Sequence, residues 1–112
     1  MRGTLLYPLL VALITIGMIP AVPAEGTNKP VGRGASLLMT NCARCHAVGR
    51  TGASPHPSAP PFPTLSHRFK IEGLAEALAE GLSTGHPEMP EFVFSAEDVG
   101  AIIEYLKSIQ QQ

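Results

Sequence analysis

The sequence predicts an all-helical domain of three or four helices joined by long loops. Two segments, 71–82 and 99–109, repeat apolar residues every three or four positions, which places these residues on one face of a helix. After residue 24, no alternating apolar run of the kind that marks a strand occurs. Glycine and proline are concentrated between the helical segments, where they indicate irregular chain.

The first 24 residues are expected to lie outside this domain. A short basic start precedes a mostly apolar segment, and Val22 and Ala24 place small residues where a signal peptidase cuts. The sequence therefore predicts a signal peptide over 1–24, with an uncleaved membrane anchor as the alternative. Removal after Ala24 would leave 88 of the 112 residues, with seven basic and nine acidic side chains. These include no basic run of the kind that binds nucleic acid.

The domain is expected to span 34–112, after a flexible lead-in over 25–33. The lead-in is polar and contains glycine and proline, which disfavour regular structure. A first helix should then run from Gly34 to about Cys42, because Gly34, Leu38 and Cys42 recur at every fourth position and share one face.

Residues 47–63 are expected to form an extended loop. Five prolines fall within nine residues there, which excludes an α-helix or a central strand. So long a loop is unusual in a small domain unless it has a function, such as enclosing a cofactor.

The next helix is expected over 71–82. Its outer face carries three carboxylates: Glu72, Glu76 and Glu80. They predict a solvated face or, alternatively, an acidic docking stripe for a partner.

The last helix is expected to begin after Ser95, following a second loop over 83–94. Ser95 and Asp98 have the spacing of a capping box, and Lys107 near the other end suits the helix dipole. The buried stripe of this helix should consist of five apolar residues: Val99, Ile102, Ile103, Leu106 and Ile109.

The chain's only two cysteines lie in the run Cys42-Ala43-Arg44-Cys45-His46. Two thiols at this spacing can each add across a vinyl group of a haem, and the histidine that follows them can then bind the iron. The other ring nitrogen of His46 needs an acceptor, and a backbone carbonyl near Pro60 is the natural candidate. The run therefore predicts one covalently bound haem c.

A second axial ligand must come from a distant part of the chain. Met39 lies on the same helix as Cys42 and cannot reach the opposite face of a haem. Met89 lies in a loop framed by Gly85 and Pro90, where an inward-pointing thioether is expected. His86 is the rival ligand, and a site left open or occupied by water is the third possibility.

Other chemistries for the two cysteines also need to be considered. A thioredoxin-like redox centre would require a βαβ context, and a plain disulfide would leave His46 unexplained. Structural zinc would require further ligands from His56, His67 or His86. The sequence otherwise predicts that His56 and His67 are loop histidines in contact with solvent, or alternatively that they lie near a haem propionate.

Over about residues 30–110, the chain resembles the small monohaem cytochromes c with histidine and methionine ligands that occur in bacterial periplasms. That resemblance implies a cytochrome c fold wrapped around the haem, in which Gly34 lets the first and last helices cross closely and Tyr105 packs near Leu38. It also implies haem attachment outside the cytoplasm. The motifs that carry it are Gly34-X3-Leu38-X3-Cys42, Cys42 to His46, Ala59-Pro60-Pro61-Phe62, Met89-Pro90 and Tyr105-Leu106.

The expected function is that of a periplasmic one-electron carrier whose haem iron cycles between Fe(II) and Fe(III). No acid–base pair or nucleophile array indicates an enzyme, so the partners should be a redox donor and acceptor in transient contact. Many relatives dock through a ring of lysines, but only Lys29, Lys70 and Lys107 follow the predicted cleavage site. The alternatives are a fixed electron-transfer subunit of a dehydrogenase or oxidase, a haem-based gas sensor, and a membrane-anchored carrier facing the periplasm.

Overall fold

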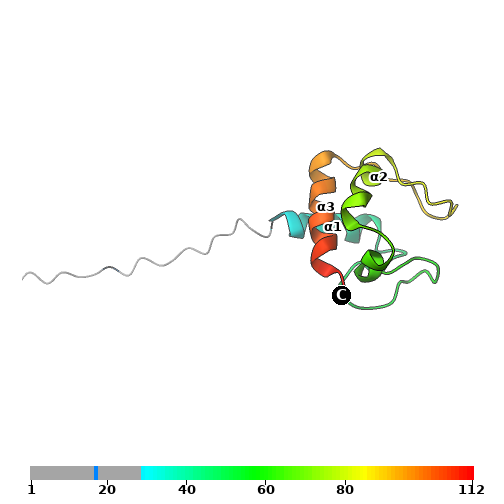
Figure 1. Ribbon diagram of the computed structural model, residues 1–112, viewed down its shortest axis with the longest axis horizontal. Coiled ribbons are helices and arrows are strands. Elements are labelled where there is room, and N and C mark those ends of the chain that lie inside the picture. Colours follow the sequence, from blue (N-terminus) through cyan, green and yellow to red (C-terminus); the bar gives the residue numbers. More distant parts are fainter. Residues whose placement is uncertain (1–16, 18–28) are drawn as a thin grey trace, which may run out of the picture.

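The computed structural model describes Gly17 and residues 29–112, and within that part the fold is all-helical, as the sequence predicts (Figure 1). No strand occurs among these residues. The remainder of the predicted signal peptide and residues 25–28 of the lead-in lie outside the described residues. In chain order the elements, with η marking a 3₁₀-helix, are α1 (Lys29–Asn41), η1 (Phe62–His67), η2 (Ile71–Gly73), α2 (Leu74–Glu80) and α3 (Ala96–Ile109).

Helix α1 begins at Lys29 instead of Gly34, so the prediction of a flexible lead-in is wrong for residues 29–33. Pro30 lies in the first turn, where a helix does not need its missing N–H and where its fixed φ favours helical geometry. Arg33 links this end of α1 to α3, because its guanidinium lies 2.6 Å from a carboxylate oxygen of Asp98. The sequence pattern could not reveal this tertiary contact.

The middle of the chain is less regular than predicted. The proline-rich loop ends before Pro63, because η1 has already begun, and proline is tolerated in the first turn of a helix. The helix predicted over 71–82 is divided into one 3₁₀ turn, η2, and the short α-helix α2, which ends at Glu80. Gly81 terminates α2, since its φ of 107° takes the backbone out of helical geometry.

Helix α3 follows the prediction closely. The hydroxyl oxygen of Ser95 accepts a hydrogen bond from the backbone N–H of Asp98 at 3.2 Å, which caps the helix. Acidic residues occupy the first turn and Lys107 the last, as the helix dipole favours. The five predicted stripe residues are all buried: Val99, Ile102, Ile103, Leu106 and Ile109.

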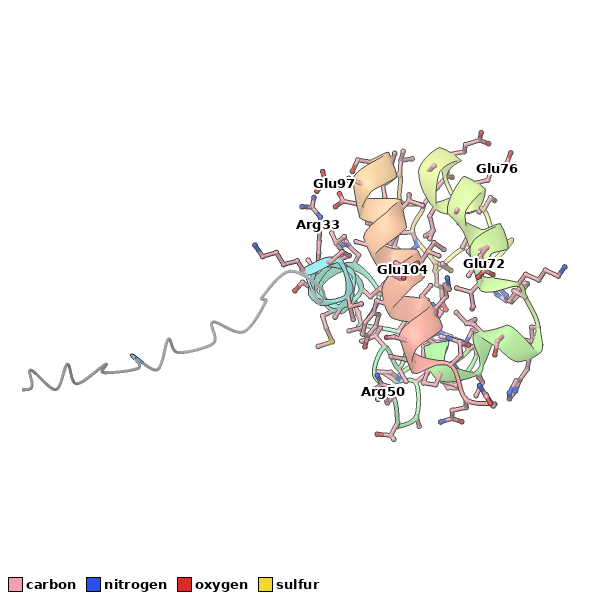
Figure 2. The ribbon with its side chains drawn as sticks, turned by 60° about the vertical axis from the view of Figure 1, so that its left-hand side comes forward. Arg33, Arg50, Glu72, Glu76, Glu97 and Glu104 are labelled. Atoms are coloured by element: carbon pink, nitrogen blue, oxygen red, sulfur yellow. The ribbon has the colours of Figure 1, made fainter. Side chains whose placement is uncertain are left out.

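The crossing of α1 and α3 forms the centre of the core. Figure 2 shows α1 end-on while α3 runs across it. At the crossing, Gly34 lies against the backbone carbonyl of Ala101 so closely that a Cβ atom would have no room. Leu38 of α1 and Ile102 of α3 are almost completely buried. Glycine therefore allows the contact on which the rest of the core is built.

The outer face of α2 is acidic and exposed. Glu72 of η2 and Glu76 and Glu80 of α2 are all exposed, and Figure 2 labels the first two. In the part of the chain that the structure describes, Glu72 alone of these three has a cationic neighbour, since its carboxylate lies 3.7 Å from the ammonium group of Lys107. Among the described residues, no helix has the length and apolar character needed to cross a membrane.

Candidate functional site

The two cysteines and His46 lie in a tight turn that continues α1. The backbone N–H of Cys42 donates to the carbonyl of Leu38 at 2.8 Å, as in an uninterrupted helix. The N–H groups of Cys45 and His46 then both donate to the carbonyl of Cys42, at 3.1 and 2.9 Å. Because of these bonds, the two sulfurs and the imidazole are carried by one compact backbone unit.

Both cysteines are free thiols and partly buried. Burial raises the pKa of the Cys42 thiol to about 11, and neighbouring Cys45 adds a smaller effect in the same direction. Cys42 is therefore a neutral thiol at physiological pH, packed against the hydrophobic core. This environment suits an uncharged sulfur, such as that of a thioether.

The imidazole of His46 is oriented by two neighbours. Its Nδ1 atom lies 2.8 Å from the carbonyl oxygen of Pro60, the acceptor that the sequence suggests. Since a carbonyl can only accept, Nδ1 carries the proton and the lone pair of Nε2 is left for a metal. The Phe62 ring packs against the imidazole, with centroids 4.7 Å apart. Such contacts fix the tautomer and direction of a metal-binding histidine.

The residues that follow His46 are hydrogen-bonded to other parts of the domain. The phenol of Tyr105 in α3 donates to the carbonyl of Val48 at 2.8 Å. Next to it, the N–H of Phe62 donates to the carbonyl of Ala47 at 2.9 Å, which draws the end of the proline loop back to the turn. Helix α3 thus positions the residues that follow His46.

We expect Tyr105→Phe to destabilise the folded holoprotein by about 1 kcal/mol, because it leaves the Val48 carbonyl without its donor while keeping the ring. Thermal or denaturant unfolding followed by circular dichroism would measure this. Ser108→Ala removes a hydroxyl from the same helix, and within residues 29–112 that hydroxyl bonds to the nearby carbonyl of Tyr105 alone. This change should alter stability by no more than about 0.5 kcal/mol. Equal stability of the two variants would contradict the assigned role of Tyr105.

Met89 lies in the loop between α2 and α3, on a separate segment from His46. The Met89 side chain is partly buried, whereas His86, the rival ligand, is exposed. The N–H of Met89 donates to the carbonyl of His86 at 3.1 Å and closes a turn. Gly85, just before this turn, has a φ of 72°. Met39, which lies on α1, is 60% exposed.

His56 is the residue whose surroundings the sequence does not predict. Its Nε2 atom lies 2.9 Å from a carboxylate oxygen of Glu88, next to Met89 in the chain. Both histidines are in contact with solvent as expected, since the side chain of His56 is 38% exposed and His67 is exposed at the end of η1. The sequence does not indicate the pairing of His56 with Glu88. No local pattern signals the pair, because its partners come from two irregular loops that meet only in the folded chain.

The alternative chemistries find no support in the described residues. Between residues 29 and 112, no three Cys, His, Asp or Glu side chains converge as metal ligands, so a zinc site at Cys42 and Cys45 lacks its remaining ligands. The arrangement does fit a covalently held haem. It offers two free thiols on one turn, an imidazole with Nε2 available, and a thioether on another loop.

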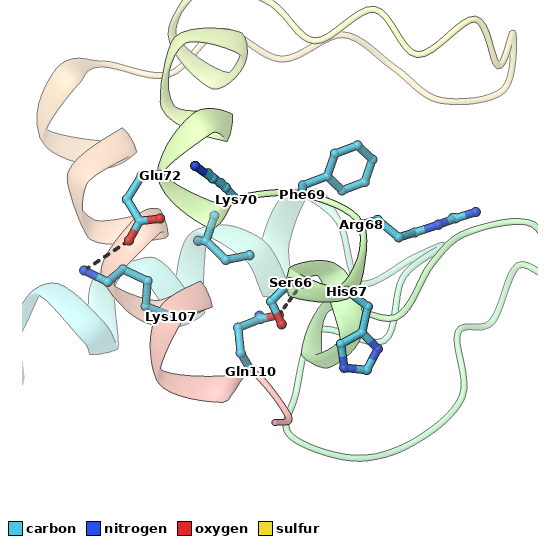
Figure 3. A pocket seen from close by; sticks show the side chains of 9 residues that line it. Ser66, His67, Arg68, Phe69, Lys70, Glu72, Lys107 and Gln110 are labelled. Carbon is cyan, nitrogen blue, oxygen red and sulfur yellow. Dashed lines mark hydrogen bonds and ion pairs between the residues drawn. The ribbon is translucent and has the colours of Figure 1, made fainter.

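A surface groove of about 600 Å³ lies away from these residues, between residues 66–72 and the end of α3 (Figure 3). Its walls combine charged and polar side chains with the apolar Phe69 and Ile71. They include the bond from the N–H of Ser66 to the side-chain oxygen of Gln110, at 2.8 Å. None of the candidate site residues lines it. The groove is therefore separate from the site built around His46.

The sequence is similar to known proteins over most of its length. Residues 29–106 match the family model described as cytochrome c oxidase, cbb3-type, subunit III. The chain is also 34% identical over 79 residues to cytochrome c-552 of Bradyrhizobium diazoefficiens, an alignment that covers 70% of this chain and 74% of that protein. No solved structure gives a significant match.

Proposed function

The chain belongs to the family of small c-type cytochromes, which transfer electrons, and we propose that it is a one-electron carrier with a single covalently bound haem. The observation that carries the proposal is the orientation of His46 beside two free thiols, with Nδ1 engaged by Pro60 and Nε2 available. Because the sequence contains only two cysteines, one haem is proposed. When bound, the haem supplies the Fe(II)/Fe(III) couple.

We propose Met89 as the second axial ligand. Its side chain is partly buried, whereas that of His86 is exposed, and it lies on a loop remote in sequence from the attachment turn. A thioether favours Fe(II) and so raises the reduction potential relative to a second histidine. In this arrangement the iron would be held by His46 on the tight turn and by Met89 on the longer loop.

We also propose that the carrier works in the periplasm. The basic start, the apolar segment and the small residues ahead of position 25 support export, which attachment of haem c in this family requires. Exchange with its redox donor and acceptor would occur through small, transient contacts. If the N-terminal segment is retained, it would anchor the carrier to the membrane on the same side.

A second candidate function is that of an electron-transfer subunit held within an oxidase, which the description of the matching family model favours. Gentle extraction from cells distinguishes the two roles. A carrier elutes at the size of the free chain on gel filtration, whereas a fixed subunit elutes together with a larger haem protein.

The ferric absorption spectrum tests the proposed ligands. The wild-type protein should show the weak long-wavelength band that marks iron–methionine ligation in this family, and Met89→Ala should abolish the band and lower the reduction potential. The reduced variant should also bind carbon monoxide, because its sixth position is open. His86→Ala, a change in the same loop, should keep the band.

Absence of the band in the wild-type protein would defeat the assignment of Met89. Rapid carbon monoxide binding by the reduced wild-type protein at neutral pH would favour a gas-binding role instead. Retention of the band in Met89→Ala would likewise exclude this residue as the ligand.

A further inference from the structure

We propose that His56 and Glu88 form a clasp that holds the loop of Met89 in place, so that both act as positioning residues for the second axial ligand. The inference rests on the proposed ligation by His46 and Met89. Its starting point is the contact of 2.9 Å between Nε2 of His56 and a carboxylate oxygen of Glu88. Within residues 29–112, this is the one hydrogen bond that joins the proline-rich loop to the loop between α2 and α3.

His56 is itself fixed to the attachment turn. Its backbone N–H donates to the carbonyl of Cys45 at 3.1 Å, so the residue moves with the cysteine that precedes His46. Through Glu88, the same residue reaches the immediate neighbour of Met89. One side chain therefore connects the two segments that carry the proposed ligands of the iron.

The geometry also defines the direction of the hydrogen bond. The backbone N–H of Ser58 donates to Nδ1 of His56 at 3.1 Å, so Nδ1 is an acceptor and carries no proton. In the neutral ring the proton is then on Nε2, which donates it to Glu88. The bond from Ser58 thus selects the tautomer of His56 in which Nε2 donates to Glu88.

The methionine loop, residues 81–95, has few other hydrogen bonds near Met89 to the rest of the described chain. The nearest bond to another element joins the N–H of Phe94 to the carbonyl of Leu78, at 2.9 Å and close to the end of the loop. The bond from Met89 to His86 lies within the loop and cannot fix it to the domain. A loop with so few external bonds is expected to open locally at little cost, and the clasp lies where that opening would release Met89.

The expected effect is moderate because the pair is solvent-accessible. The side chain of His56 is 38% exposed and that of Glu88 is 80% exposed. Exposed pairs of this kind contribute little to global stability, and loss of this one should increase loop opening by roughly two- to fivefold. Global unfolding does not report such a change, whereas replacement of Met89 by an added ligand does.

The test is the rate at which imidazole binds to the ferric holoprotein, followed by stopped-flow absorbance. Imidazole can reach the iron only after Met89 leaves it, so the rate reports opening of the loop. His56→Ala and Glu88→Ala should each accelerate binding roughly two- to fivefold. The double variant should bind no faster than the faster single variant, because both substitutions break the same contact.

Two control variants match these changes. His67→Ala removes an exposed histidine from η1, and Glu80→Ala removes an exposed carboxylate from the end of α2. Both should keep the wild-type rate. Unchanged rates in His56→Ala and Glu88→Ala would overturn the clasp, as would fully additive effects in the double variant. If His56→Ala and Glu88→Ala lowered the unfolding temperature without faster imidazole binding, the pair would only stabilise the fold. That result would also overturn the proposal.

The same experiment separates this inference from the proposed function. If the wild-type protein shows the iron–methionine band but the variants bind imidazole at the wild-type rate, the clasp fails and the ligand assignment stands. If the wild-type protein lacks the band, the ligand assignment fails, and the clasp fails with it.

Discussion

Replacing both Cys42 and Cys45 with alanine is expected to leave a chain that binds no covalent haem and is largely unfolded. The reason is the small size of the core. Few large side chains are fully buried, and several apolar residues along α2 and the loop after it are only partly covered, among them Leu74, Leu78 and Phe94. A domain of this size depends on a cofactor or another covalent staple for stability.

Far-ultraviolet circular dichroism and thermal unfolding would measure this effect. The double variant should show a coil-like spectrum and no cooperative transition, and haem should not remain with the chain on a denaturing gel. Wild-type chain produced without its haem is the control, because it lacks the cofactor but keeps both cysteines, and it should be equally unfolded. A cooperative transition in either apo chain would show that the helices fold without the haem.

Gly34→Ala is expected to destabilise the holoprotein by about 3 kcal/mol, because the added methyl group would overlap the backbone carbonyl of Ala101. The obstacle is main chain rather than a flexible side chain, so the helices α1 and α3 must separate to relieve it. Separation would expose Leu38 and Ile102, the best-buried side chains of the core. Denaturant unfolding of the holoprotein measures the loss.

Gly32 provides a matched control on the same helix. A Cβ atom at this position meets no other atom within 4 Å, and the residue is exposed. Gly32→Ala should therefore stabilise the protein by about 0.5–1 kcal/mol, through helix propensity alone. If Gly34→Ala were tolerated as well as Gly32→Ala, the helices would not meet at this position as described.

The charged side chains on the surface of η2 and α2 bear on the choice of partners. The exposed carboxylates of η2 and α2 and the small number of lysines distinguish this chain from relatives that dock through a lysine ring. Lys107, one of the few lysines, is engaged by Glu72 and by Glu104, at 3.7 and 3.5 Å. Its charge is thus partly neutralised within the domain itself.

The features that the sequence predicts correctly are those with a local or periodic cause. The stripe and cap of α3 follow from side-chain spacing along one helix, and the structure confirms both. The run from Cys42 to His46 is equally local, because one helical turn brings its side chains together whatever the rest of the chain does. Haem chemistry could therefore be inferred before any fold was known.

The predictions that failed concern places where tertiary contacts override local preference. The first helix extends back to Lys29 because Arg33 finds carboxylates on α3, and no pattern in residues 25–33 reveals them. The short helix η1 forms in a proline-rich stretch because its residues pack on α3, where the side-chain amide of Gln110 donates to the carbonyl of Phe62 at 2.9 Å.

The sequence by itself determined the helical class, the attachment turn and the identity of the candidate ligands, since each depends on residue type and short-range spacing. Only the tertiary structure decided how these parts are held. In the folded chain, Gly34 contacts the backbone of Ala101 and the phenol of Tyr105 donates to the carbonyl of Val48, two residues after His46. The imidazole of His56 meets the carboxylate of Glu88. Such pairs join residues far apart in the chain, and their geometry exists only once the helices have packed.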